Sequence, residues 1–224
     1  MTSLPPRTAP SLGQAIQDSL PVFFLIALAG ATDALMVLHS VHLFAVYVTG
    51  DTAKIGVALS QGRLDAALAP LPAVILVFFA ATTLAAGAGA AAGNRRGALL
   101  LAACAALLAA ATAVAAEPYP LAAVLLIAAA MGTLNQVRAS EPGVTFITGT
   151  LVKTGRALAA GDLAGTSIGL LRWASFLAGV ILSAWLDTQF APHTLGLVAG
   201  AAAIGAGWAW RASPAGLGGL QSKA

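Results

Sequence analysis

The chain has 224 residues, of which 59% are hydrophobic and only 8% are charged, with a formal net charge of +3. Soluble domains carry charge on roughly a quarter of their residues, so a soluble fold of this size cannot hide so much apolar surface. The Lys and Arg residues lie between apolar runs and form no patch, which excludes a nucleic-acid-binding protein and predicts an integral membrane protein.

Apolar stretches need about 20 residues to cross a bilayer as a helix. Six such stretches follow one another along the chain: 20–38, 69–92, 97–116, 120–137, 166–186 and 193–210. Two further stretches, 46–61 and 145–161, are shorter or more polar, and we expect them to form re-entrant or interfacial helices. The predicted fold is therefore an all-α membrane protein with about six transmembrane helices and two short helices.

The positions of the basic residues predict the orientation, because Lys and Arg collect on the cytoplasmic side. With six spans and a cytoplasmic N-terminus, eight basic residues lie inside and two outside. Those inside are Arg7, Arg95, Arg96, Arg138, Lys153, Arg156, Arg211 and Lys223; those outside are Lys54 and Arg63. If the short stretches also spanned, this bias would vanish. We expect a protein of the bacterial inner membrane, with a cytoplasmic segment 1–19, one domain over 20–211 and a flexible cytoplasmic tail 212–224.

The sequence repeats itself. Residues 49–64 align with residues 148–163, and eight of the sixteen positions are identical: Thr, Gly, Lys, Gly, Ala, Leu, Gly and Leu. Upstream, Gly30 and Asp33 correspond to Gly132 and Asn135. We infer two copies of one unit, over about 20–116 and 120–210. Because each copy has three spans, the second must enter the membrane upside down, as in many secondary transporters.

Polar residues within the spans are the first candidates for a site. An ionised carboxylate at Asp33 costs roughly 2.5 to 3.5 kcal/mol in the membrane on insertion scales. It is either a proton- or cation-linked group or a buried contact to a neighbouring helix. Asn135 and Gln136, in the second copy, favour a polar centre shared between the two copies.

The two Thr-Gly pairs are the second group of candidates. Thr can cap a helix and Gly lets the backbone turn sharply, while helix N-termini suit anionic or polar solutes. The alternative is that they only begin interfacial helices. Lys54 and Lys153 follow each Thr by five residues and either flank the same site or extend to lipid headgroups. The predicted substrate-binding residues are Asp33, Thr49, Gly50, Asp51, Lys54, Asn135, Gln136, Thr148, Gly149 and Lys153.

Other chemistry finds little support. His39 and His42 are spaced to share a metal with Asp51, but two histidines without a clear third ligand favour wet interfacial side chains. No nucleophile, zinc-protease, phosphate-loop or dinucleotide motif is present, so we predict no enzyme, no metal and no cofactor.

Several of these blocks together resemble the YoaK-like family of bacterial membrane proteins, a family of unknown function. The resemblance rests on residues 30–34 (Gly-Ala-Thr-Asp-Ala), 48–52 (Val-Thr-Gly-Asp-Thr), 130–136 (Ala-Met-Gly-Thr-Leu-Asn-Gln) and 147–151 (Ile-Thr-Gly-Thr-Leu). It covers most of residues 20–210 and implies a polytopic membrane protein without supplying a substrate.

The sequence leaves two functions open. The first is a small secondary transporter or permease for an unidentified solute, in which one repeat rocks against the other; a chain this short also favours a homodimer. The second is a non-transporting membrane protein that binds a lipid or a protein partner, with its polar residues serving only helix packing.

Overall fold

The computed structural model describes residues 11–40, 48–62 and 70–213. The helices are α1 (Leu12–His39), α2 (Val48–Ser60), α3 (Pro70–Ala92), the 3-10 turn η1 (Gly93–Arg95), α4 (Arg96–Val114), α5 (Leu121–Leu134), α6 (Ile147–Ala159), α7 (Leu163–Phe190) and α8 (Thr194–Ala212). The part of the chain that is described holds no strand. Most of the predicted N-terminal segment and tail, and with them Arg7, His42, Arg63 and Lys223, lie outside the described residues.

Three described stretches are long and apolar enough to cross a membrane: Leu12–His39, Pro70–Val114 and Leu163–Phe190. The second is α3 and α4 joined by η1, so it folds back on itself. Helices α2 and α6, of 13 residues each, fall in the two short stretches of the sequence. These observations confirm the predicted all-helical membrane fold.

Helix α5 is shorter than its predicted range of 120–137. It spans 14 residues, or about 21 Å, against a hydrocarbon core of about 30 Å. Directly after its end, the Asn135 side chain turns to Thr145: its amide donates to the Thr145 hydroxyl at 3.0 Å, and its carbonyl oxygen accepts from the Thr145 backbone N–H at 3.1 Å. Residues 135–146 therefore form a closed loop between α5 and α6.

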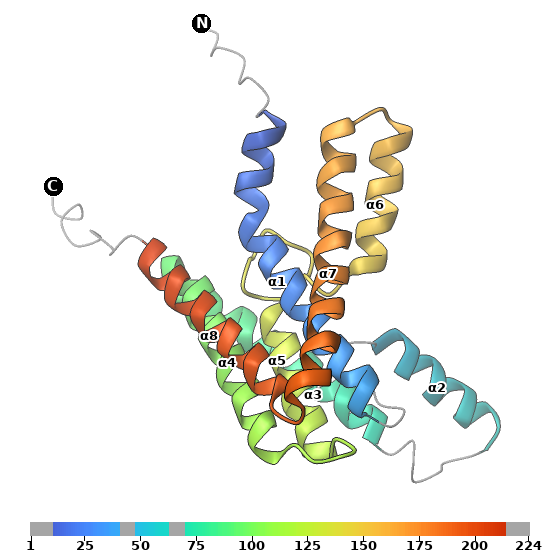
Figure 1. The fold of residues 1–224 in the computed structure, drawn as a ribbon. Coiled ribbons are helices and arrows are strands. Elements are labelled where there is room, and N and C mark those ends of the chain that lie inside the picture. The colour runs from blue at the N-terminus through green and yellow to red at the C-terminus, as the bar shows by residue number, and fades with distance from the viewer. Residues whose placement is uncertain (1–10, 41–47, 63–69, 214–224) are drawn as a thin grey trace, which may run out of the picture.

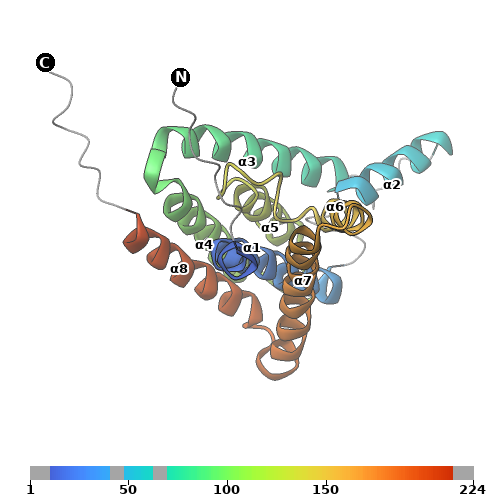
Figure 2. The same cartoon turned by 90° about the horizontal axis from the view of Figure 1, so that it is seen from above.

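The helices pack in a defined set of pairs. Helix α1 lies against α7, α3 against α5, and α4 against both α5 and α8, while α6 pairs with α7 and α2 with α3. In Figure 1, α6 lies beside the N-terminal half of α7, and α2 lies near the C-terminal end of α1, at the other end of the molecule. Figure 2 shows α3, α4 and α8 lying across the view while the first part of α1 and α6 are seen nearly end-on.

Two of these pairs cross at a glycine that has no room for a side chain. A Cβ on Gly30 of α1 would lie 2.2 Å from the Phe176 carbonyl oxygen of α7, and one on Gly132 of α5 would lie 2.6 Å from the Phe78 carbonyl oxygen of α3. Close backbone approach through small residues is a common way to pack membrane helices, because lipid gives no hydrophobic drive between them.

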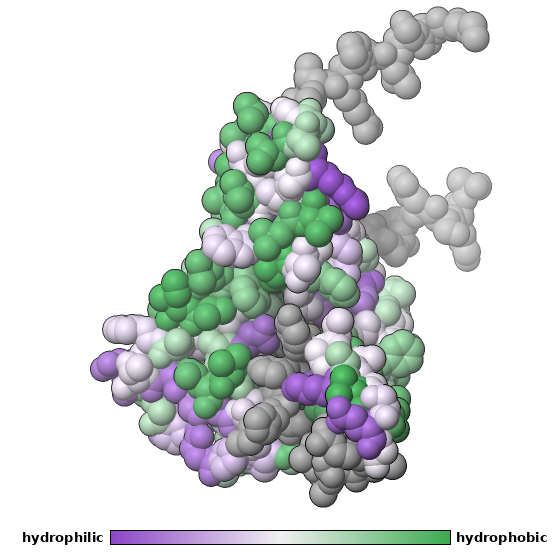
Figure 3. Space-filling model, turned by 90° about the vertical axis from the view of Figure 1, so that its right-hand side faces the viewer, coloured by the Kyte–Doolittle hydropathy of each residue, from purple (hydrophilic) through white to green (hydrophobic). Residues whose placement is uncertain are grey.

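The outer surface carries many large apolar side chains. Exposed examples on α7 include Leu163, Leu170, Ile181, Leu182 and Trp185. Figure 3 shows hydrophobic side chains over much of the upper and middle part of one face, with hydrophilic ones more frequent toward its lower end. An apolar exterior around a helical core is the arrangement expected in lipid.

The glycine crossings lead to a stability prediction. Gly30→Ala and Gly132→Ala should each lower stability by about 1–3 kcal/mol, because the added methyl overlaps a backbone carbonyl that cannot rotate away. Thermal unfolding of the purified protein in detergent measures the effect. Gly87→Ala, in α3 with nothing within 4 Å of the new methyl, is the matched control. Equal midpoints for all three variants would contradict tight packing at the two crossings.

Candidate functional site

A pocket of about 450 Å³ lies where α1, the 135–146 loop, α6 and α7 meet. We call it the α6–α7 pocket. Val22 and Ile26 of α1, Phe146, and Ile168 of α7 supply apolar walls. Its charged lining residues are Glu141, Lys153 and Arg172. Ligand pockets commonly have this composition, with apolar walls and a few converging polar groups.

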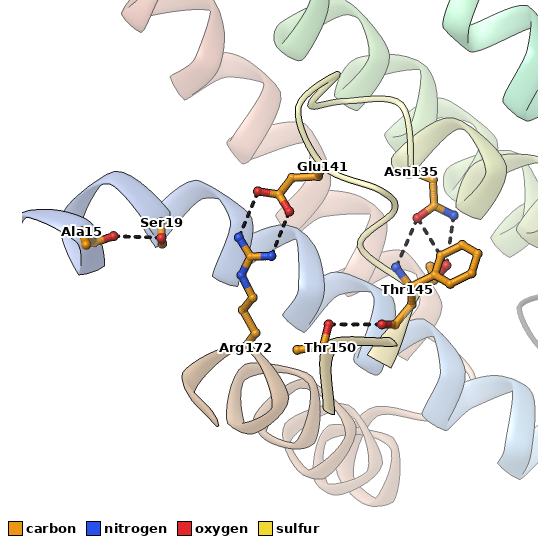
Figure 4. Close-up of polar contacts among 8 residues, drawn as sticks. Ala15, Ser19, Asn135, Glu141, Thr145, Thr150 and Arg172 are labelled. Atoms are coloured by element: carbon orange, nitrogen blue, oxygen red, sulfur yellow. Dashed lines mark hydrogen bonds and ion pairs between the residues drawn. The ribbon is translucent and has the colours of Figure 1, made fainter. Parts of the chain in front are cut away.

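Arg172 and Glu141 form a two-pronged ion pair at one wall of the pocket. The Nη1 and Nη2 atoms of Arg172 donate to the two carboxylate oxygens of Glu141 at 2.8 and 2.9 Å, as Figure 4 shows. Both side chains are largely buried, with exposed fractions of 24% and 16%. A bidentate guanidinium–carboxylate pair is both strong and directional. The pair joins the α5–α6 loop to α7, an apolar helix of 28 residues in which Arg172 is the tenth.

The Arg172–Glu141 ion pair leaves nitrogen donors near the pocket without partners in the described part of the chain. The Arg172 Nε is buried and has no hydrogen-bond partner among the described residues. Within the same part of the chain, no ion pair of Lys153 is found. The three charged lining residues sum to a formal charge of +1. The pocket therefore has a net attraction for anions.

Helix α6 brings small and hydroxyl side chains to the pocket. Gly149, Thr150 and Thr154 line it from the first two turns of the helix. Helix α6 approaches α7 closely, since a Cβ on Gly169 would lie only 2.9 Å from the Thr154 Cβ. The Thr154 hydroxyl donates to the Thr150 carbonyl oxygen at 2.8 Å. The beginning of α6, where backbone N–H groups lack helical partners, thus faces the pocket.

Two of the ten predicted site residues, Gly149 and Lys153, line the α6–α7 pocket. Thr148 is exposed beside it. Asn135 is buried and closes the loop that carries Glu141. Gln136 lies elsewhere: its backbone carbonyl accepts from the Arg96 Nε at 2.7 Å, and its side-chain oxygen faces the Arg96 Nη2 at 3.3 Å.

The five predicted residues of the first copy lie outside this pocket's lining. Asp33 is half-buried within α1, and Thr49 and Gly50 begin α2. Asp51 is fully buried, and one of its carboxylate oxygens lies 3.2 Å from the Lys54 Nζ. The predicted common centre of both copies is therefore divided in this structure, with the second copy lining the pocket.

Arg172 and Glu141 are not among the site residues predicted from the sequence. A basic residue in the middle of an apolar stretch was a usable signal, because such a residue needs a partner in the membrane. Glu141 could not have been found in this way, because it lies in a short polar segment between two apolar stretches, where a carboxylate is ordinary.

A second polar cluster lies at the other end of α7, and we call it the His39 cluster. The His39 Nε2 lies 2.9 Å from an Asp187 carboxylate oxygen, and its Nδ1 lies 2.5 Å from one of Glu117. The imidazole stacks on the Tyr119 ring at 5.0 Å between centroids. Burial raises the pKa of Tyr119, and the charges of Asp187 and Glu117 raise it further. The cluster fastens the end of α1 to α7 and to the α4–α5 connection.

The fold and these two sites define an all-helical membrane protein with a charged pocket among its helices. The chain belongs to the family described as Protein of unknown function (DUF1275), whose model matches residues 22–208. The family assignment from the sequence is confirmed. Among curated proteins and among solved structures, nothing matches the chain.

The ion pair generates a double-mutant prediction. Glu141→Gln or Arg172→Gln alone should lower stability by about 3 kcal/mol, because either change leaves a largely buried charge without its partner. The double variant should recover most of that loss, since neither charge remains. Thermal unfolding in detergent measures all three. Arg156→Gln, at an exposed position on α6, is the control. Additive losses in the double variant would contradict a direct pairing.

The His39 cluster predicts a late tyrosine titration. The chain has two tyrosines, so in a Tyr47→Phe variant the phenolate absorbance reports Tyr119 alone. It should stay low through the pH range around 10 in which a free phenol ionises, because burial and two carboxylates disfavour the phenolate. The same variant unfolded in denaturant should titrate normally. Identical curves for the folded and unfolded protein would refute the packing of Tyr119.

Proposed function

We propose that this protein is a secondary transporter for a small solute, built from two halves of opposite orientation in a bacterial inner membrane. The observation that carries the proposal is the location of the α6–α7 pocket. It lies between α1, from the first half, and α6 and α7, from the second. Transporters built from inverted repeats bind their substrates at such a boundary.

The helix pairs support the two halves. Suppose that each helix of the first half is exchanged with its counterpart in the second: α1 with α5, α2 with α6, α3 with α7 and α4 with α8. The α1–α7 pair then becomes α5–α3, the α2–α3 pair becomes α6–α7, and the α4–α5 pair becomes α8–α1. The pairs α3–α4 and α7–α8 also exchange, and α4–α8 and α1–α5 map onto themselves. All these pairs are in contact. The glycine crossings at Gly30 and Gly132 are one such exchanged pair.

The charges support an orientation with both termini in the cytoplasm. Arg95 stacks on Trp210 at 4.4 Å, and the Ser213 hydroxyl donates to the Asn94 carbonyl oxygen. The η1 turn and the end of α8 therefore share one basic end of the molecule. The His39 cluster, with two carboxylates, lies at the C-terminal end of α1, away from this basic end. Basic residues on one side and acidic ones on the other fit the positive-inside rule.

The structure also suggests how access would alternate. Arg172 and Asp187 are fifteen residues apart on α7, which is about 22 Å along the helix. The Glu141 pair thus holds one part of α7, and the His39 cluster holds another. In the proposed cycle these contacts open in turn as one half rocks on the other. Asp33, half-buried on α1, is the proposed proton- or cation-linked group.

A second candidate function is lipid binding without transport. It is favoured by another pocket, of about 740 Å³, between α1, α4 and α8. Its lining is mainly apolar, with Phe24, Leu101, Ile204 and Trp208, and Arg138 stands among the lining residues. An acyl chain with an anionic headgroup matches this combination.

Flux through reconstituted protein tests the proposal. Proteoliposomes are challenged with panels of small organic anions, cations, zwitterions and neutral solutes, and saturable uptake is measured for wild type, Asp33→Asn and the packing-neutral Gly87→Ala. We expect at least one solute to be taken up by wild type and Gly87→Ala, and uptake to fall at least about tenfold in a folded Asp33→Asn. If the wild type takes up no solute from any panel and is stabilised by anionic lipid, the transporter proposal is contradicted and lipid binding takes its place.

A further inference from the structure

The α6–α7 pocket contains features that select a particular class of ligand. The planar guanidinium of Arg172 already binds a carboxylate through two parallel hydrogen bonds, to Glu141. This geometry suits carboxylates better than spherical ions, because the two donors match the two oxygens. Apolar walls from Val22, Ile26 and Ile168 leave space for a carbon skeleton beside that charge.

We propose that the pocket binds one small monocarboxylate with an apolar body, and that the ligand takes the place of Glu141 on Arg172. This deepens the proposed function, on which it rests for the pocket being the solute site. Glu141 is then an internal competitor. It neutralises Arg172 while the pocket is empty and leaves when a solute carboxylate arrives.

Charge and hydrogen bonding both favour the exchange. With Glu141 in place, the charged lining still sums to +1, because Lys153 adds a second positive charge. An anion is therefore attracted before the exchange begins. Glu141 also leaves the Arg172 Nε without a partner among the described residues. Release of Glu141 lets the Arg172 side chain shift so that a ligand can also reach this buried donor, whereas Glu141 is restricted by its loop.

The loop allows Glu141 to move without unfolding its neighbours. The hydrogen bonds between Asn135 and Thr145 hold the two ends of the loop together. Glu141 lies between these ends, outside any helix, and Gly143 follows it with a φ of 134°. The carboxylate is thus carried by a short non-helical segment whose ends stay fixed while its middle shifts.

Binding to purified protein tests the exchange directly. The probes are butyrate and benzoate, paired with their neutral amides butyramide and benzamide, with methylammonium as the cation and sodium chloride as the ionic-strength control. Ligand-dependent thermal shifts and calorimetry are recorded for wild type, Glu141→Gln, Arg172→Gln and Arg156→Gln. The rise in unfolding midpoint at saturating probe reports binding to the folded state.

We expect the carboxylates, and not the amides or methylammonium, to stabilise wild type and Arg156→Gln, and Arg172→Gln to lose the effect. Glu141→Gln should start from a lower midpoint yet bind the carboxylates about tenfold more tightly, because the competitor that occupies Arg172 is gone. A merely structural Glu141 would give unchanged or weaker binding in this variant, which overturns the proposal. Stabilisation of wild type by phosphatidylglycerol alone, with no response to the carboxylates, also overturns it.

Flux of the same probes separates this inference from the transporter proposal. Carboxylate binding that depends on Arg172, without flux of any solute, leaves the ligand assignment standing and refutes transport. Saturable flux of amines or neutral solutes, without carboxylate binding, leaves transport standing and refutes the assignment. Carboxylate flux that falls in Arg172→Gln and persists in Arg156→Gln supports both.

Discussion

A guanidinium within an apolar membrane helix must keep a negative partner, because an unpaired buried charge costs several kcal/mol. Arg172 finds that partner in Glu141, on the loop between α5 and α6. The requirement shapes the second half of the chain. It draws the 135–146 loop against α7, places the beginning of α6 beside the same helix, and leaves a pocket between these elements and α1. The ion pair forms one wall of this pocket.

Close backbone contacts at glycines are a second feature of the packing. At Gly30 and Gly132, two pairs of helices cross with a carbonyl oxygen where a side chain would otherwise lie. Together with the exchange of helix pairs, these crossings support the proposal of two inverted halves joined at equivalent points. This is the architecture on which the proposed transport cycle depends.

Hydropathy was sufficient to predict the helices. The range 166–186 lies within α7, 193–210 begins one residue before α8 and ends inside it, and the short polar stretches contain α2 and α6. The repeat aligned Gly30 with Gly132, and both are crossing points. These features could be predicted because helix length and the positions of small residues depend on the local sequence.

Contacts between distant residues could not be predicted in this way. His39 and Asp187 are 148 positions apart, and nothing in either neighbourhood specifies the other. The predicted range of α5 ran three residues too far, across Asn135 and Gln136, and the loop that follows is closed by a tertiary contact from Asn135 to Thr145. Gly149 and Lys153, which the repeat pointed to, line the pocket, but the Arg172–Glu141 ion pair at its wall involves residues outside the repeated motif.

The account depends most on the two halves having opposite orientations, and labelling of single cysteines measures this directly. Cys104 is the one cysteine in the chain, so Cys104→Ala gives a background into which Ser60→Cys, at the end of α2, and Ala160→Cys, just after α6, are introduced separately. Both positions are exposed. A membrane-impermeant maleimide added to intact cells should label the cysteine at position 60 and not the one at 160, and inverted vesicles should give the reverse. Labelling of both from the same side would contradict the inverted halves and the transport cycle built on them.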